Sequence, residues 1–277
     1  MPELPELEVV SEVLNRRVID RPIARVEVIA PAGAIVLRDL AGRGVEAALT
    51  NDRFAGVQRR GKFLVFSLQA TPDLLLVINP KLTGRLQLAA TGAKRFAKTA
   101  LALSFDAGQE LRYVDQKMMG QVYLTERLAD VPGFAEMGPE ALEISLADFT
   151  ARLRPFRGEI KGVLVRSEFV AGIGNAYADE ILWAARLHPY RKRTQLTAAE
   201  VERLYAAMRA TLIEATDKMR VEMGEEIHRE PRTFLQVHLR TGEPCPRCGA
   251  PIALVSANQR ITNFCRTCQP GGLIKGM

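Results

Sequence analysis

The four cysteines of this 277-residue chain constrain its fold more than any other feature. They read Cys-x2-Cys, sixteen residues, and Cys-x2-Cys, at Cys245, Cys248, Cys265 and Cys268. Two such knuckles at this separation suit a tetrahedral zinc ion, which holds four thiolates at about 2.3 Å. Two disulfides in a secreted chain are the alternative, but no export signal is visible and a reducing cytosol disfavours them. We therefore expect one structural zinc ion.

The segment around the cysteines is basic and too small to fold unaided. Seven basic but only two acidic residues lie from His228 to Met277, so the last fifty residues carry five of the net six positive charges. Between the knuckles, Ile252–Val255 and Ile261–Phe264 are strand-like runs. We expect a zinc-stapled β-hairpin with Arg260 at its tip, where an arginine suits a phosphate-lined groove. The metal would supply the stability that so small a core lacks, and a purely structural ribbon is the alternative.

Composition and length describe a globular chain of two or three compact units. Hydrophobic residues make up 47% and charged residues 25% of the chain, which excludes a disordered protein. No apolar run approaches the about 20 residues of a membrane helix. The acidic opening Met1–Glu6 is unlike an export signal, so we expect a cytoplasmic protein, nucleoid-associated in a bacterium. The net charge of +6 favours an anionic partner only mildly, and a solvated basic surface is the alternative.

The chain predicts three kinds of structure in succession. Pro2–Glu6 opens a helix, because its prolines suit a first turn and its acids suit the positive end of the helix dipole. Short β-rich runs follow to about Glu126, as in a β-sandwich or barrel, and a boundary near Asp130–Gly133 precedes a helical stretch. We expect strands at Arg25–Ala30, Gly56–Arg59, Phe63–Leu68, Leu74–Asn79, Leu101–Phe105 and Leu111–Val114, and helices at Leu146–Leu153, Glu159–Val165, Asn175–Leu187 and Thr197–Met219. Thr197 and Glu200 form a capping box at the start of the last helix.

A tight turn, Ala171–Asn175, separates two of these helices. Its Gly172 and Gly174 would expose backbone N–H groups at a helix N-terminus, where a phosphate can bind. Most such turns only let two helices pack closely. Beside a basic zinc ribbon, however, the turn is typical of one half of a clamp on a nucleic-acid backbone.

Several motifs together resemble the formamidopyrimidine-DNA glycosylases and their relatives, the endonuclease VIII enzymes, nearly from end to end. They are Met1–Glu6, Arg59–Leu64, Leu111–Asp115, the Gly172–Asn175 turn, and Gln259-Arg260 leading into Phe264–Gln269. The resemblance implies an α+β multidomain fold: a catalytic β-sandwich with a leading helix (1–130), a helix–two-turn–helix DNA-binding domain (131–227) and a zinc ribbon (228–277). Leu4 favours the formamidopyrimidine branch, since endonuclease VIII enzymes usually carry Gly there.

The resemblance implies a bifunctional DNA glycosylase and abasic-site lyase that acts in base-excision repair, as a monomer, on damaged double-stranded DNA. Removal of Met1 would leave Pro2 as a terminal amine, whose pKa of about 8 keeps a useful fraction neutral. Attack on C1′ would expel the base and form an iminium ion, and β,δ-elimination would cut the strand. Glu3 would shuttle protons, and Glu6 would hold the amine or relay a proton. Ordinary helix-dipole acids are the alternative for both glutamates.

The resemblance also implies contacts with DNA. Lys62 and Arg260 would bind phosphates on either side of the flipped nucleotide and complete the catalytic set, and Asn175 would support the same backbone. Lys161 would contact a phosphate or the damaged base, although a plain surface lysine explains it equally well. Because a base inside a duplex cannot reach Pro2, the nucleotide must be extruded, at a cost of a few kcal/mol.

Two turns depart from the family pattern. Asn79–Gly84 replaces the usual His-Leu-Gly-Met-Ser-Gly, and Asp115–Gly120 replaces Asp-Pro-Arg-Arg-Phe-Gly. The side chains that fill the space of the extruded nucleotide would then be Leu82, Lys117 and Met119. Because lysine cannot make the bidentate fork of arginine, we expect relaxed or altered recognition of the base opposite the lesion.

The damaged base itself is not specified by these motifs. The segment Glu222–Phe234, where contacts with that base are expected, has no clear family match. Oxidised purines are the leading expectation. An oxidised-pyrimidine glycosylase of the endonuclease VIII type and a catalytically reduced lesion-binding paralogue are the alternatives.

Overall fold

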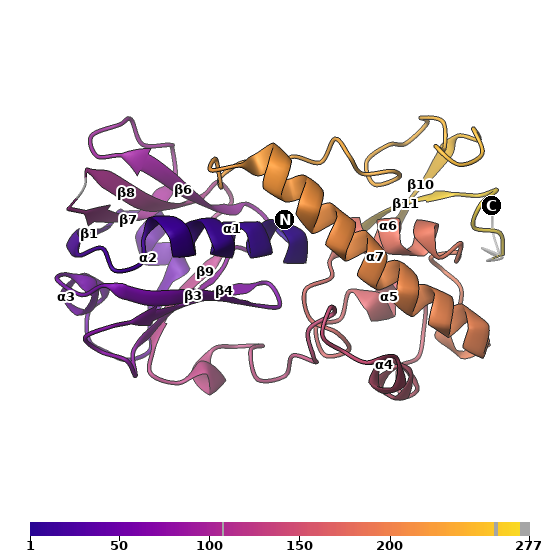
Figure 1. Ribbon diagram of the computed structural model, residues 1–277, viewed down its shortest axis with the longest axis horizontal. Helices are drawn as coiled ribbons and strands as arrows, with labels where there is room; N and C mark the ends of the chain where they lie inside the picture. Colours follow the sequence, from indigo (N-terminus) through magenta and orange to yellow (C-terminus); the bar gives the residue numbers. More distant parts are fainter. Residues whose placement is uncertain (107, 258–259, 272–277) are drawn as a thin grey trace. The chain divides into compact units, whose positions relative to one another are not determined.

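A computed structural model describes residues 1–106, 108–257 and 260–271 of the protein. By internal packing the chain divides into two compact units (Figure 1). The first contains Met1–Glu136 and Lys218–Pro231, and the second contains Met137–Asp217 and Arg232–Met277. The division into three domains inferred from the sequence remains a prediction.

The first unit opens with helix α1 (Leu4–Arg17), as expected. Its start is fixed by a capping box, in which the Glu3 and Glu6 carboxylates each accept a backbone N–H of the other end of the first turn. Such a box satisfies two amides that a helix N-terminus otherwise leaves unpaired. Leu7, Val10 and Leu14 are buried on this helix, which packs against strands β3 and β4.

Two β-sheets form the rest of the first unit. One has the strand order β2-β9-β5-β4-β3 and the other β1-β7-β8-β6. The strands are β1 (Ile23–Val28), β2 (Leu37–Asp39), β3 (Phe54–Arg60), β4 (Phe63–Leu68), β5 (Leu75–Asn79), β6 (Gly84–Ala90), β7 (Thr99–Phe105), β8 (Gln109–Asp115) and β9 (Gln121–Thr125). Short helices α2 (Ala32–Val36), α3 (Val45–Leu49) and η1 (Leu128–Asp130) connect them. All neighbouring strands are antiparallel except β2 and β9.

Two turns carry the chain from one sheet to the other. The turn at 80–83 joins β5 to β6, and the turn at 116–120 joins β8 to β9. Gly84 pairs with Asp115 in one sheet, and Asn79 pairs with Gln121 in the other. The two turns therefore lie side by side at one end of the unit.

The second unit combines helices with a C-terminal β-hairpin. The helices are α4 (Leu146–Leu153), α5 (Ile160–Leu164), α6 (Asn175–Ala184), η2 (Arg193–Gln195) and the larger part of α7 (Ala198–Met223). The expected Thr197–Glu200 capping box is present at the start of α7. Strands β10 (Ile252–Ala257) and β11 (Arg260–Cys265) pair in the antiparallel register of a hairpin. No helix in the described part of the chain is both long and apolar enough to span a bilayer.

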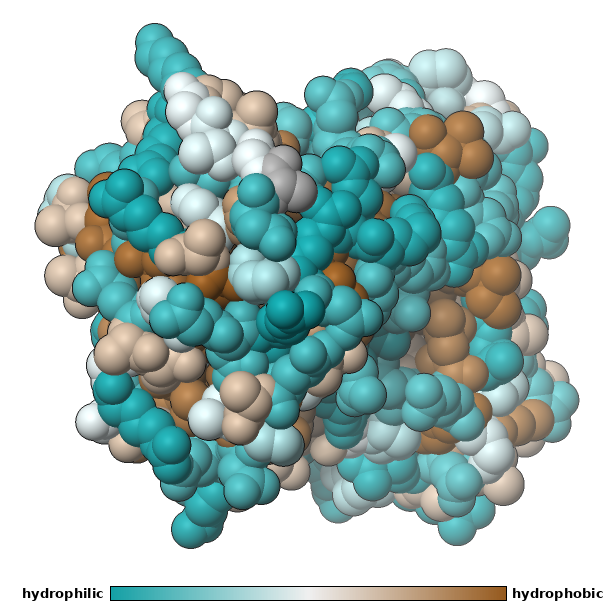
Figure 2. Space-filling view, turned by 60° about the vertical axis from the view of Figure 1, so that its left-hand side comes forward, coloured by the Kyte–Doolittle hydropathy of each residue, from teal (hydrophilic) through white to brown (hydrophobic). Residues whose placement is uncertain are grey.

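The face of the molecule seen in Figure 2 is largely hydrophilic, with apolar side chains in separate patches. Among the described residues, the large apolar side chains that are exposed include Leu82 and Met119, at 40% and 53%. Both belong to the two turns between the sheets, which is where the sequence placed the space-filling side chains.

Candidate active site and zinc centre

The N-terminus of the first unit lies at an apolar, partly open pocket. Pro2 and Glu6 contribute to its wall, together with Arg85 and Tyr113 from the four-stranded sheet and Glu230 from the segment after α7. Pro2 is buried, and Glu3 and Glu6 are only 1% and 2% exposed. The structure therefore brings together the predicted nucleophile and both predicted acids.

Met1 covers Pro2 in the full chain, so the Pro2 nitrogen is an amide there. The Met1 ammonium lies 3.3 Å from a carboxylate oxygen of Glu230. Arg85 binds the other oxygen of the same carboxylate. Glu230 is thus an ion-pair partner at the N-terminus that the sequence motifs did not reveal, because it lies in the segment without a family match.

Glu6 has a defined structural task beside any chemical one. Its Oε2 accepts the backbone N–H of Glu3 at 2.9 Å, which anchors the residue next to Pro2 to the first turn of α1. A removed or shortened Glu6 would let this backbone move. The contact is compatible with the expected role of Glu6 in holding the N-terminus. It does not test the other expected role, the relay of a proton.

Lys62 lies in the tight turn between β3 and β4, beside Gly61, whose φ of +57° places it in the left-handed region. Lys62 is half-buried. The neighbouring Arg59 is fixed by Glu8 at 2.5 Å and by the Gly61 carbonyl at 3.1 Å. These contacts of Arg59 fix the chain just before Lys62, whose contact with a phosphate remains a prediction.

The second unit places two predicted DNA contacts under the hairpin. The Lys161 ammonium donates to the Ile261 carbonyl and to the Thr262 hydroxyl, each at 2.9 Å. The Asn175 amide, at the start of α6, donates to the same Ile261 carbonyl at 2.9 Å. Lys161 and Asn175 are therefore brought together, and both hold the strand that follows Arg260. The side chain of Arg260 itself lies outside the described residues.

A buried carboxylate completes this arrangement. Asp179 of α6 forms an ion pair with Lys161, with 2.6 Å between the charged atoms. It also lies 2.8 Å from His238 Nδ1 and accepts a hydrogen bond from the Asn263 N–H at 3.1 Å. The side chains of Lys161 and Asp179 are 7% and 0% exposed, so this is a buried ion pair and not a surface one. Sequence reasoning missed Asp179 and His238, because neither belongs to a recognised motif.

The next residue of α6 fixes the approach to the hairpin. The Glu180 carboxylate accepts the backbone N–H groups of Gln236, Val237 and His238 at 2.8–2.9 Å. Burial raises the pKa of Glu180, and these three N–H groups oppose that rise. Asp179 and Glu180 together attach both the hairpin and the segment before it to one helix.

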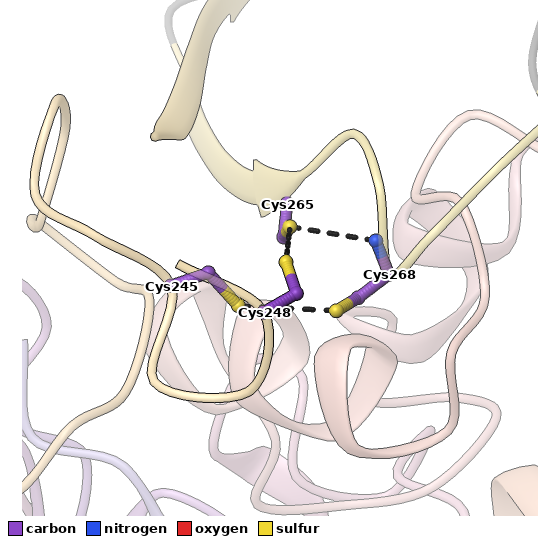
Figure 3. Close-up of side chains that lie close together, drawn as sticks. All are labelled: Cys245, Cys248, Cys265 and Cys268. Atoms are coloured by element: carbon purple, nitrogen blue, oxygen red, sulfur yellow. Dashed lines mark hydrogen bonds between the residues drawn. The ribbon is translucent and has the colours of Figure 1, made fainter. Parts of the chain in front are cut away.

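The four cysteines converge as the sequence predicted (Figure 3). Their sulfur atoms all lie within 4.8 Å of one another, and the Cys245–Cys268 and Cys248–Cys265 pairs are 3.9 and 3.4 Å apart. A tetrahedron with arms of about 2.3 Å has sulfur atoms about 3.8 Å apart, so the cluster fits zinc. The four thiolates would hold the ion.

Trp183 of α6 supports the cluster. Its indole N–H donates to the Cys245 sulfur at 3.4 Å, and the Arg247 guanidinium stacks 4.1 Å above its ring. Burial of Cys245 raises the pKa of its thiol, but the backbone N–H groups of Arg247 and Cys248, the Trp183 N–H and the Cys265 thiol together outweigh burial and lower this pKa to about 6.

Comparisons with known proteins agree with this geometry. Residues 1–122 match the N-terminal domain of formamidopyrimidine-DNA glycosylase, residues 137–226 its H2TH domain, and residues 242–271 the zinc finger found in FPG and IleRS. The formamidopyrimidine-DNA glycosylase of Symbiobacterium thermophilum is 39% identical over 98% of this chain and 90% of its own. The chain belongs to the formamidopyrimidine-DNA glycosylase family. The Nocardioides sp. enzyme of the same name is 38% identical over 98% of this chain and 95% of its own.

Solved structures of the family superpose on nearly the whole chain. The Lactococcus lactis enzyme in complex with DNA containing an abasic site has a TM-score of 0.86 and 30% identity, covering 97% of this chain and 100% of that one. A complex of MutM with DNA containing carbocyclic 8-oxo-G has a TM-score of 0.84 and 31% identity, over 98% and 100%. The expected family, architecture and single structural zinc are confirmed. The assignments of individual site residues remain predictions.

Proposed function

We propose that this chain excises oxidised purines from double-stranded DNA and then cuts the strand at the resulting abasic site, with Pro2 as the nucleophile. The observation that carries the proposal is the placement of Pro2 and Glu6 at one pocket, with the buried Glu3 next to Pro2 and bonded through its backbone N–H to Glu6. Family members solved with DNA containing 8-oxo-G or an abasic site support the substrate class.

The chemistry begins once Met1 has been removed. The lone pair of the Pro2 amine attacks C1′, and the damaged base leaves with the electrons of the glycosidic bond and a proton. Opening of the sugar ring gives an iminium ion, and Glu3 supplies and removes protons at the sugar. Loss of the C2′ proton expels the 3′ phosphate, and a second elimination expels the 5′ phosphate. Water then hydrolyses the iminium and returns the free amine.

The remaining residues bind and shape the DNA. Lys62 and Arg260 bind phosphates on either side of the extruded nucleotide, and Asn175 supports the same backbone. Leu82, Lys117 and Met119 fill the space that the nucleotide leaves, as side chains inserted into a kinked duplex do. Zinc contributes no step of the reaction; its thiolates stabilise the hairpin that carries Arg260.

Lys161 can serve this scheme without touching DNA, since its ammonium already holds the hairpin. Direct contact of Lys161 with a phosphate or the damaged base stays a prediction. We also propose that the enzyme works as a monomer in the cytoplasm, at the nucleoid in a bacterium. Light scattering of the free protein and of its DNA complex tests the monomer.

The nucleophile is tested by comparing two forms of one protein. A cleavable N-terminal extension blocks Pro2, and proteolysis that leaves Pro2 first in the chain exposes it, with mass spectrometry to verify both states. Borohydride should trap a covalent complex with an abasic-site duplex only after cleavage, and Pro2→Gly should weaken trapping severely. Equal trapping by the blocked form would exclude the mechanism.

A further inference from the structure

The two turns that carry the space-filling side chains are joined through one buried carboxylate. Asp115, at the end of β8, is 0% exposed. Its Oδ1 accepts the Thr83 hydroxyl at 2.5 Å, across from the turn at 116–120 to the turn at 80–83. Its Oδ2 accepts the Gly120 N–H at 2.6 Å. One carboxylate therefore holds both ends of its own turn and the facing turn.

Thr83 returns the connection. Its hydroxyl oxygen accepts the Lys117 N–H at 2.9 Å while its proton goes to Asp115. Leu82 immediately precedes Thr83, and Met119 immediately precedes Gly120. Each exposed apolar side chain is thus one residue away from a hydrogen bond to Asp115.

Packing of the Tyr113 side chain against both turns leaves them little room to move. The Tyr113 hydroxyl lies so close to Gly84 and Gly120 that a Cβ on either glycine would collide with it. Both glycines are buried; Gly84 directly follows the turn that carries Leu82, and Gly120 is the last residue of the turn that carries Met119. The turns are therefore held by packing against Tyr113 and by the hydrogen bonds of Asp115 and Thr83.

We propose that Thr83 and Asp115 are positioning residues for base extrusion, which couple Leu82 and Met119 into one rigid wedge. Charge-assisted hydrogen bonds to a buried carboxylate are strong enough to fix short turns. A wedge that enters a base stack must resist the stacking it displaces, and two separate flexible tips would fold back instead. This role rests on the proposed glycosylase function, because it concerns the step that precedes attack by Pro2.

The test separates extrusion from chemistry by using two duplexes of one sequence. One contains 8-oxoguanine, whose base must be unstacked, and the other contains a preformed abasic site, which has no base to unstack. Thr83→Val removes the hydroxyl at nearly constant volume, and Thr83→Ser is the matched control that keeps it. Single-turnover rates are measured for all forms, with circular dichroism and zinc content to verify folding.

We expect Thr83→Val to slow 8-oxoguanine excision by about tenfold, which corresponds to about 1.4 kcal/mol. Cleavage at the abasic site should change by less than about threefold, about 0.6 kcal/mol, and Thr83→Ser should restore excision. In the Thr83→Val background, Leu82→Ala should add little further loss, because coupled residues are not additive.

Three results would overturn the proposed coupling of Leu82 and Met119 through Thr83 and Asp115. They are equal losses on both duplexes, no loss on either, or a Thr83→Ser variant that is as slow as Thr83→Val. Additive losses from Leu82→Ala and Thr83→Val would overturn it as well. If the unaltered enzyme with a free Pro2 cleaves neither duplex, the proposed function fails, and the wedge role fails with it. If the unaltered enzyme is active and Thr83→Val excises 8-oxoguanine at the same rate, only the proposed role of Thr83 and Asp115 fails.

Discussion

Lys161→Met should destabilise the second unit of the protein by about 3 kcal/mol, the lower end of the range for breaking a buried ion pair. The ammonium lies 2.6 Å from Asp179 Oδ1, and the carboxylate is fully buried. Methionine keeps most of the aliphatic stem but leaves the Asp179 charge uncompensated in a site with little water. The lower end applies because His238 and the Asn263 N–H still bind the other carboxylate oxygen.

The assay follows urea unfolding through Trp183, the single tryptophan of the chain. This side chain lies in the second unit and donates to Cys245, so its fluorescence reports that unit. Lys192→Met is the matched control, since Lys192 is exposed and the same change there should stay within about 0.5 kcal/mol. In an Asp179→Asn background, Lys161→Met should cost no more than about 1–2 kcal/mol, because the ion pair is already absent and only the hydrogen bonds of the ammonium to Ile261 and Thr262 are then lost.

A Lys161→Met variant that is as stable as Lys192→Met would refute this reasoning. So would an equal cost of Lys161→Met in the presence and absence of the Asp179 charge. Either result would show that the Lys161 ammonium does not compensate Asp179, and would return Lys161 to the DNA-contact role expected from its family position.

Two further predictions concern zinc and the base opposite the lesion. Cys265→Ser should remove most of the zinc measured by metal analysis, alter Trp183 fluorescence and weaken DNA binding, while the first unit unfolds at an unchanged urea concentration; freshly purified protein without zinc would contradict the assignment. Excision from duplexes that differ only in the opposite base should vary by less than about a hundredfold, roughly 2.7 kcal/mol, because Lys117 offers a single-point contact. Lys117→Arg should widen that spread, and a wide spread in the unaltered enzyme would show that another residue reads the base.

The parts of the fold that sequence predicted well are those with local signals. The α1 start, the Thr197–Glu200 capping box and the cysteine knuckles each depend on residues close together in the chain, and all three formed as expected. Strands β2, β6 and β9 were not predicted, although Gly84–Ala90 of β6 alternates apolar and polar residues over its first part. Its partner β8 was found, so the pairing and not the strand pattern alone defines β6.

Element ends show the same limit. The third expected helix ends at Ala184 and not at Leu187, and the last continues to Met223 beyond the expected Met219. Leu187 N–H is taken by the Leu182 carbonyl in the turn that ends α6, and Arg186 there has a φ of +55°. No residue in that stretch is a glycine or proline that would announce the end.

The site divides along the same line. Roles for Pro2, Glu3 and the cysteines could be predicted because they depend on adjacent residues or on fixed spacings. The structural roles of Asp115, Asp179 and Glu230 could not, because each carboxylate contacts a partner far away in the sequence: Thr83, Asn263 and the N-terminus. A lone Asp or Glu in a sequence is usually a solvated charge, and only its burial in the structure shows that it connects distant segments of the chain.

Helix α6 shows why such junctions matter for function. Asn175, Asp179 and Trp183 follow one another at spacings of four residues, so they share one helix face, and Glu180 directly follows Asp179. Asn175 and Asp179 hold strand β11, Glu180 holds the residues before the hairpin, and Trp183 reaches a zinc ligand. The helix that begins at the Gly172–Gly174 turn therefore also supports the hairpin and the metal. If Asn175 and Arg260 bind phosphates as predicted, displacement of either end of α6 would move both contacts, and loss of zinc would then affect more of the predicted DNA-binding surface than the ribbon alone.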